Sequence, residues 1–106
     1  MFYLWIVVII TKAKIIEFYN NETKAKEPIL QWYNITLLSN WHDFHSIKQT
    51  FNSVDSVGND RYIFNVGGNK YRIVAMIHFS KRTVYLRFVG THKQYDKIDC
   101  KTVWDF

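Results

Sequence analysis

Apolar and polar residues alternate with a period of two over much of the second half of the chain, between residues 61 and 89. This period is typical of β-strands that bury one face, because successive side chains point to opposite sides. It predicts three strands, at residues 61–66, 70–79 and 83–89. Glycine accepts the positive φ of a tight primed turn, so Gly67-Gly68 is expected to join the first two strands. Ser80-Lys81-Arg82 closes the second predicted hairpin.

The first forty residues follow a helical pattern after a short apolar run. Residues 6–10 are apolar and mostly β-branched, which predicts a first strand buried on both faces. Thr11 is expected to cap a helix that runs through Asn20. Thr23 is expected to cap a second helix with Pro28 in its first turns. The apolar stripe of this second helix, which we interpret as core with ligand binding as the alternative, consists of Ile29, Trp32, Tyr33 and Leu37.

The polar, turn-rich residues 39–57 predict a surface connection with one short helix, capped by Ser46 and ending at Phe51. The element order is then β-α-α-β-β-β. It predicts an α+β domain with helices packed on one face of a mostly antiparallel sheet. A chain of 106 residues is expected to form one domain over residues 1–106.

Charge is distributed unevenly along the chain. The net charge is +5, and residues 61–101 hold nine Lys or Arg but only two Asp or Glu. Basic side chains carried on strands form a fixed positive surface, which suits a phosphate-bearing partner. A solvated face that aids solubility is the alternative.

Three further observations narrow the class of protein. Cys100 is the single cysteine, so no intramolecular disulfide can form and a reducing cytoplasm is the expected compartment. His42 and His45 lack the neighbouring ligands of a metal cluster. The apolar residues 1–10 are too few for a membrane helix, which needs about 20, and they lack the features of a secretory signal. We therefore expect no metal and no membrane contact.

Strand alternation decides which side chains can meet. In the strand 70–79 the predicted core face holds Tyr71, Ile73, Ala75, Ile77 and Phe79, and the opposite face holds Arg72, Val74, Met76 and His78. In the strand 83–89 the corresponding sets are Val84, Leu86 and Phe88 against Tyr85, Arg87 and Val89. Arg72 and Arg87 are therefore expected on one open face, where two guanidiniums invite a phosphate between them. Pairing with a carboxylate such as Asp96 or Asp99 is the alternative.

Groups suited to proton transfer follow the last predicted strand. Histidine changes its charge near neutral pH, which makes His92 a candidate proton shuttle. Tyr95 lies three residues further on, on the same side of a turn if Thr91 caps one, and its ring could instead stack on a base. A capping or packing role is the alternative for His92, and Asp96 is expected to orient an arginine or the histidine.

Two stretches of this sequence resemble HigB-type toxins of bacterial type II toxin–antitoxin modules. They read Y-I-F-N-V-G-G-N-K-Y-R-I-V-A-M at 62–76 and Y-L-R-F-V-G-T-H-K-Q-Y-D-K at 85–97. The patterns F-N-V-G-G-N-x-x-R and R-x-V-x-T-H-x-x-Y-D occur together at the family's usual separation. The resemblance extends from about Val7 to Asp99. Ile9-Ile10-Thr11 and Phe51-x-Ser53-x-Asp55 support it.

The resemblance implies a RelE-like fold and an mRNA interferase, an endoribonuclease that cuts mRNA in the ribosome and is neutralised by a HigA-like helix-turn-helix antitoxin. It implies metal-independent cleavage, without a cofactor, by attack of the ribose 2′-OH on the adjacent phosphate. The residues expected to act in catalysis are Arg72, Arg87, His92 and Tyr95. Those expected to contact RNA are Asn69, Lys70, Lys93 and Lys97.

Members of this family usually begin at about Val7, so residues 1–6 look like an N-terminal extension. Two alternatives to cleavage stay open. The basic face could hold RNA or ribosomal RNA without cutting it. It could also dock an acidic partner such as an antitoxin.

Overall fold

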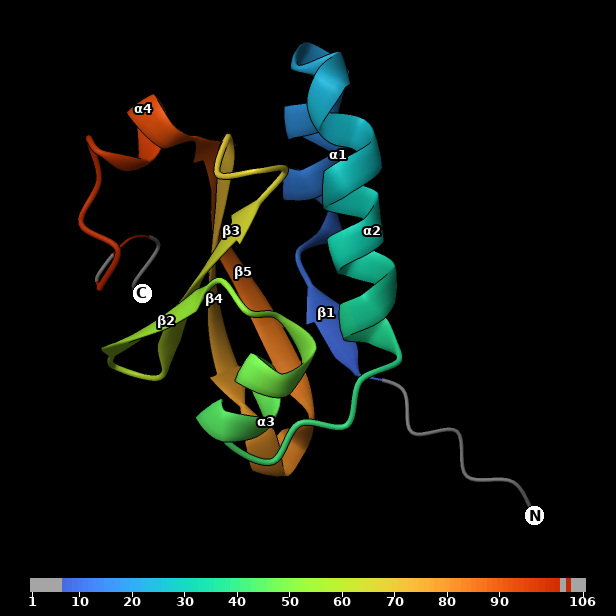
Figure 1. The fold of residues 1–106 in the computed structure, drawn as a ribbon, viewed down its shortest axis with the longest axis vertical. Coiled ribbons are helices and arrows are strands. Elements are labelled where there is room, and N and C mark those ends of the chain that lie inside the picture. Colours follow the sequence, from blue (N-terminus) through green and yellow to red (C-terminus); the bar gives the residue numbers. More distant parts are fainter. Residues whose placement is uncertain (1–6, 102, 104–106) are drawn as a thin grey trace.

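A five-stranded sheet forms the centre of the computed structural model, which describes residues 7–101 and 103 (Figure 1). The strands are β1 (Val8–Ile10), β2 (Val54–Gly58), β3 (Arg61–Val66), β4 (Tyr71–His78) and β5 (Thr83–Thr91). Their order across the sheet is β1-β5-β4-β3-β2. β1 runs parallel to β5 and every other neighbouring pair is antiparallel, so the predicted mostly antiparallel sheet is confirmed.

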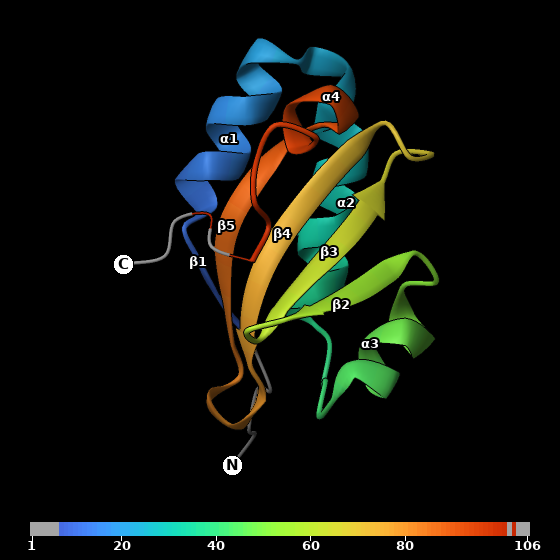
Figure 2. The ribbon, with the colours of Figure 1, turned by 90° about the vertical axis from the view of Figure 1, so that its left-hand side faces the viewer.

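Two long helices cover one face of this sheet (Figures 1 and 2). They are α1 (Lys12–Asn21) and α2 (Lys26–Leu37), joined by the 3-10 turn η1 (Thr23–Ala25). The shorter elements are α3 (Phe44–Thr50), η2 (Phe79–Lys81) and α4 (His92–Tyr95). The α+β class is confirmed. Among the described residues, no helix combines the length and apolar character that a membrane crossing requires.

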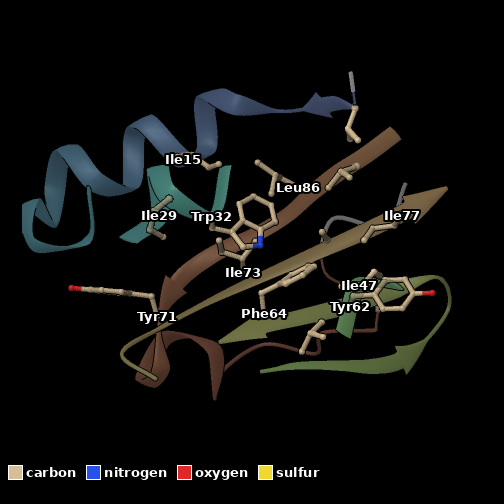
Figure 3. Close-up of a cluster of buried hydrophobic side chains, with 14 of the residues drawn as sticks. Ile15, Ile29, Trp32, Ile47, Tyr62, Phe64, Tyr71, Ile73, Ile77 and Leu86 are labelled. Carbon is tan, nitrogen blue, oxygen red and sulfur yellow. The ribbon is translucent and has the colours of Figure 1, made fainter. Parts of the chain in front are cut away.

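Buried side chains form a cluster between these helices and the sheet (Figure 3). Ile15 of α1 and Ile29 of α2 are fully buried, and Trp32 is 1% exposed. The Trp32 ring meets the Phe64 ring edge-on, with centroids 5.2 Å apart. The apolar stripe of the second helix is therefore core. Its last buried position is Thr36, whereas Leu37 is half-buried.

The turn between β3 and β4 requires glycine for two reasons. Gly67 and Gly68 have φ of 64° and 63°, in the left-handed region that L side chains rarely adopt. A Cβ atom on Gly67 would also lie 2.8 Å from the Tyr71 ring. The predicted glycine turn is confirmed, although the loop runs through Asn69 and Lys70 because Val66 pairs with Tyr71.

Two predictions for residues 39–57 are wrong. Residues 54–58 form the edge strand β2 rather than a surface connection, because a tight turn folds them back on β3. Gly58, Asn59 and Asp60 make that turn with φ of 86°, 56° and 58°. Such residues tolerate the left-handed conformation, and this was an available sequence signal.

The short helix α3 is capped by Asp43 and not by Ser46. The Asp43 side chain accepts a hydrogen bond from the Ser46 backbone N–H at 2.9 Å. The Ser46 hydroxyl accepts one from the Asp43 backbone N–H at 3.1 Å. These two bonds make a capping box, in which the residue three positions after the cap is itself a polar partner.

The first strand is not buried on both faces. Val8 and Ile10 are 53% and 42% exposed, whereas Val7 is buried and Ile9 packs against the core. The reason is that β1 is an edge strand with a helix layer on only one side. Residue 6 of the predicted strand and the predicted extension at 1–6 lie outside the described residues.

A β-bulge in β5 reverses the predicted alternation. Val74 lies opposite Phe88 and Ala75 lies opposite Leu86, which leaves Arg87 as the extra residue. Beyond the bulge Val89 packs against the core, and the Phe88 ring lies on the other face. The predicted faces of Phe88 and Val89 are therefore wrong. The core faces of β4 and of Val84 and Leu86 in β5 are confirmed.

Candidate active site

The sheet face turned away from α1 and α2, the second face, is partly covered by the end of the chain. Residues 96–101 and 103, the C-terminal segment, follow α4 and cross in front of β4 (Figure 2). Ile63 and Val74 point to this face, and they are only 5% and 0% exposed. The face predicted to be open therefore leaves its accessible polar groups mainly near the end of the sheet that carries the glycine turn.

Arg72 is fixed by this turn. Its Nη1 donates hydrogen bonds to the carbonyls of Asn69 at 2.8 Å and Tyr71 at 3.2 Å. The remaining N–H groups of this half-buried guanidinium have no partner within the described part of the chain. A pre-positioned guanidinium with free donors is well suited to bind a phosphate.

A backbone hydrogen bond brings α4 to the same turn. The N–H of His92 donates to the carbonyl of Lys70 at 3.1 Å. Thr91 caps α4, because its hydroxyl accepts from the Gln94 N–H at 3.2 Å and its own N–H donates to Gln94 Oε1 at 2.8 Å. The turn and α4 therefore gather one set of exposed candidate RNA contacts, namely Asn69, Lys70 and Lys93, with Lys97 directly after α4.

His92 is oriented by a carboxylate. Its Nδ1 lies 3.5 Å from Oδ2 of Asp96, and the two side chains are 56% and 58% exposed. This pairing leaves Nε2 as the nitrogen that can reach a substrate. Thr91 provides the cap and His92 is exposed, so the alternative of a capping or packing histidine does not fit the structure.

Tyr95 lies on the second face beside Arg72. Its ring centroid is 6.4 Å from that of Phe88. Burial raises the pKa of Tyr95 to about 12; a hydrogen bond to the Cys100 side chain adds to this shift, and the charge of Arg72 opposes it. The phenol is therefore protonated at neutral pH, when it can donate a proton or a hydrogen bond but cannot act as a base.

Arg87 does not lie opposite Arg72. The register pairs Arg72 with Gly90, and an offset of three residues corresponds to roughly 10 Å along the strand. The Arg87 guanidinium instead lies 5.3 Å from the centre of the Tyr85 ring. The predicted juxtaposition of the two arginines is thus not observed, because the register of β4 and β5 keeps them apart along the strands. Neither arginine has a carboxylate partner within the described residues, so the alternative pairing is not observed either.

Arg87 lies near a second cation on α1. Burial lowers the pKa of Lys14; Glu17 opposes this shift, and the charge of Arg87 adds to it. A groove of about 360 Å³ opens between α1 and the end of β5, and Lys14, Phe88 and Gln94 are among the residues that line it. Glu17 and Glu22 also line this groove, so Lys14 does not make it a positively charged surface.

The sequence interpretation missed Phe88, Cys100 and Arg61 as neighbours of the site. No pattern in the sequence predicted the bulge that turns Phe88 toward Tyr95. The spacing Thr91-x-x-Gln94 was a visible capping-box signal for α4. No group of three or more His, Cys, Asp or Glu able to hold a metal occurs within residues 7–101 and 103.

Comparison with known proteins identifies the family of this chain. The family model of the HigB toxin, described as the RelE-like toxic component of a toxin–antitoxin system, matches residues 25–98. This chain belongs to the HigB toxin family. The matched range includes all eight predicted site residues, and the family predicted from two sequence patterns is confirmed.

Several curated HigB proteins are similar to part of this chain. The mRNA interferase toxin HigB of Escherichia coli (strain K12) is 47% identical over 53 residues, which are 48% of this chain and 51% of that protein. The mRNA interferase HigB of Shigella flexneri gives the same values. That of Escherichia coli O6:H1 is 35% identical over 40 residues, 38% of this chain and 39% of its own. The chain thus spans about half the length of the first two relatives and a smaller share of the third.

Proposed function

We propose that this HigB-family chain is an mRNA interferase, an endoribonuclease that stops translation by cutting mRNA. The observation that carries the proposal is the grouping of Arg72, His92 and Tyr95 around one turn and one short helix. The printed names of the HigB relatives, each an mRNA interferase, support it. So does the positive charge of the second half of the chain.

In the proposed reaction the ribose 2′-oxygen attacks the adjacent phosphorus and the bond from phosphorus to the 5′-oxygen breaks. His92 accepts the 2′-OH proton through Nε2 while Asp96 holds the ring. Tyr95, protonated at neutral pH, donates a proton to the leaving 5′-oxygen. Arg72 stabilises the added charge on the pentacoordinate phosphate. The products are a 2′,3′-cyclic phosphate and a 5′-hydroxyl.

The remaining predicted residues bind the substrate in this proposal. Lys70, Lys93 and Lys97 contact backbone phosphates beside the turn, and Asn69 lines the same edge. Arg87 lies three residues along β5 from the partner of Arg72, and it binds a flanking phosphate instead of the reacting one. The Phe88 ring offers a surface on which an unstacked base can lie.

The proposed partners are cytoplasmic mRNA, the ribosome on which it is translated, and a HigA-like helix-turn-helix antitoxin that neutralises the toxin. An antitoxin that covers the turn and α4 would block access to Arg72 and His92 directly. A stable complex of the two proteins, isolated after co-expression, would establish this partner.

Cleavage is tested by primer extension on translated mRNA after induction, and with purified protein in the presence and absence of ribosomes. We expect Arg72→Ala to lower the cleavage rate by about 100-fold or more, as removal of one preorganised donor does, and His92→Ala to lower it similarly. Lys24→Ala, an exposed lysine of η1, is the control. The rate should be unchanged by EDTA.

The competing function gives a different result. If both variants stop growth and translation as strongly as the parent, the basic face binds RNA without cutting it. In that case RNA affinity, measured by fluorescence anisotropy, should fall with the loss of lysines and not with the loss of His92.

A further inference from the structure

Arg61 places a guanidinium on the second face of the sheet, where it is buried instead of exposed to solvent. It is the first residue of β3, lies opposite Met76 and is only 1% exposed. A buried charge is costly unless hydrogen bonds satisfy it, and an apolar side chain would fill the same position without that cost. The arginine therefore needs an explanation in terms of what its N–H groups hold.

Arg61 holds the C-terminal segment. Its Nη1 donates to the carbonyl of Cys100 at 3.3 Å and to the carbonyl of Val103. Asn59, two residues earlier in the tight turn before β3, donates through Nδ2 to the carbonyl of Lys101 at 2.9 Å. Two side chains from one corner of the sheet thus anchor three carbonyls of the segment that crosses it.

The chain between these anchors and Tyr95 is stiffened by its own hydrogen bonds. The Ile98 N–H donates to the Tyr95 carbonyl at 3.2 Å, and the Val103 N–H donates to the Asp99 carbonyl at 2.9 Å. The Lys101 N–H donates to the Asp99 carboxylate at 3.0 Å. The Cys100 side chain is then close enough to the Tyr95 hydroxyl to raise its pKa. A displacement at Arg61 would therefore be transmitted to the phenol.

We propose that Arg61 is a positioning residue for the active site: by binding the carbonyls of Cys100 and Val103, it fixes the C-terminal segment that orients the Tyr95 hydroxyl. The expected effect of Arg61 on catalysis rests on the proposed RNA cleavage. The orientation of Tyr95 by Arg61 is independent of that proposal. Arg61 itself touches no reacting group.

The orientation is tested without substrate in the intact protein. Arg61→Lys keeps the charge but not the planar fork of donors. Asn59→Gly removes an exposed anchor and still accepts the left-handed backbone of this position, where φ is 56°. In each we expect amides 95–103 to exchange with deuterium at least ten-fold faster, while amides of α1 and α2 keep their protection. The phenolate absorbance that Tyr95→Phe removes should also appear at lower pH. Asn34→Ala, an exposed asparagine of α2, should change neither readout.

The catalytic consequence is measured on RNA. We expect Arg61→Lys to lower kcat by about ten-fold to 100-fold with little change in KM, because a misplacement of about 1 Å has effects of this size. In a Tyr95→Phe background the same substitution should have almost no further effect. An equal loss in both backgrounds would mean that Arg61 acts only on stability, and it would overturn the proposal.

The positioning role of Arg61 and the proposed RNA cleavage can be refuted independently of each other. Parental exchange rates and tyrosine titration in both Arg61→Lys and Asn59→Gly overturn the positioning role, whether or not RNA is cut. A parent protein that does not cut RNA refutes the proposed function, while exchange and titration still decide whether Arg61 orients Tyr95.

Discussion

The two faces of β4 differ in what covers them. On the face toward the helices Ile73, Ala75 and Ile77 are at most 4% exposed beneath α1 and α2. On the second face only Val74 is fully buried, and its neighbours Arg72, Met76 and His78 are half-buried. One face is covered by two long helices. The other is partly covered by the C-terminal segment, whose backbone carbonyls accept hydrogen bonds from Asn59 and Arg61.

This difference indicates that one face of the sheet determines the stability of the fold and the other carries the candidate site. The helix side buries large aromatic and aliphatic groups, which supplies most of the favourable free energy of folding. The second face leaves polar groups accessible at the end near the turn, so a substrate can reach them. Residues of the two faces alternate along the same strand, and substitutions at neighbouring positions should therefore have different effects.

The largest expected effect is on the helix side. Phe64 is 1% exposed and its ring contacts those of Trp32, Trp41 and Phe51. Phe64→Ala should lower the free energy of unfolding by about 3–5 kcal/mol, the usual cost of a large cavity. Urea denaturation measures this.

Phe88→Ala is the matched change on the second face. Phe88 is half-buried, so we expect a loss of about 1 kcal/mol in the same denaturation experiment, within the usual range for single substitutions. RNA cleavage should nevertheless fall in this variant, because a base loses its stacking surface. An equal stability loss in both variants would contradict the division between the faces.

The turn between β3 and β4 gives the next effect. Gly67→Ala places a side chain on a left-handed backbone and presses it against the Tyr71 ring. Gly68→Ala causes the same backbone strain but meets no neighbouring atom. Backbone strain of this kind costs about 1–3 kcal/mol. We expect the loss of stability to lie at the upper end of that range for Gly67→Ala and at the lower end for Gly68→Ala. Only Gly67→Ala should displace Arg72.

Both variants are measured by urea denaturation. Equal losses would show that the Tyr71 ring moves aside without cost. The cleavage rate at saturating RNA reports whether Arg72 keeps its place, because Arg72 is bonded to the carbonyls of Asn69 and Tyr71 in the same turn.

The helix side could be predicted from the sequence and the second face only in part. Alternation in β4 identifies Tyr71, Ile73, Ala75 and Ile77, because a helix layer must bury one complete face of a strand. The same rule misplaced Phe88, since a bulge adds one residue without leaving a mark in the pattern. It also could not reveal Arg61, because the partners of that side chain are backbone carbonyls some forty residues away. Chemistry and family resemblance thus predict candidate residues for the site, but contacts between distant segments set the arrangement of these residues.

The smallest expected effect is the pH dependence contributed by Tyr95. Its pKa is about 12 in the folded protein, against 10.0 for an ordinary tyrosine. Because the folded pKa is the higher one, the folded state retains its proton where the unfolded state has lost it. The resulting stabilisation is complete below pH 10 and disappears as the pH rises toward 12.

Urea denaturation at pH 9, 10 and 11 measures this contribution. Tyr95→Phe should flatten the decline of stability over that interval by a small amount, since Tyr95 is only partly buried and solvent screens the shift. Tyr33→Phe on α2, which also removes one tyrosine, should retain the parental decline. A decline in Tyr95→Phe as steep as in the parent would show that neither burial nor Cys100 raises the pKa of the phenol. The C-terminal segment would then cover the second face of the sheet without controlling the chemistry of its most accessible end.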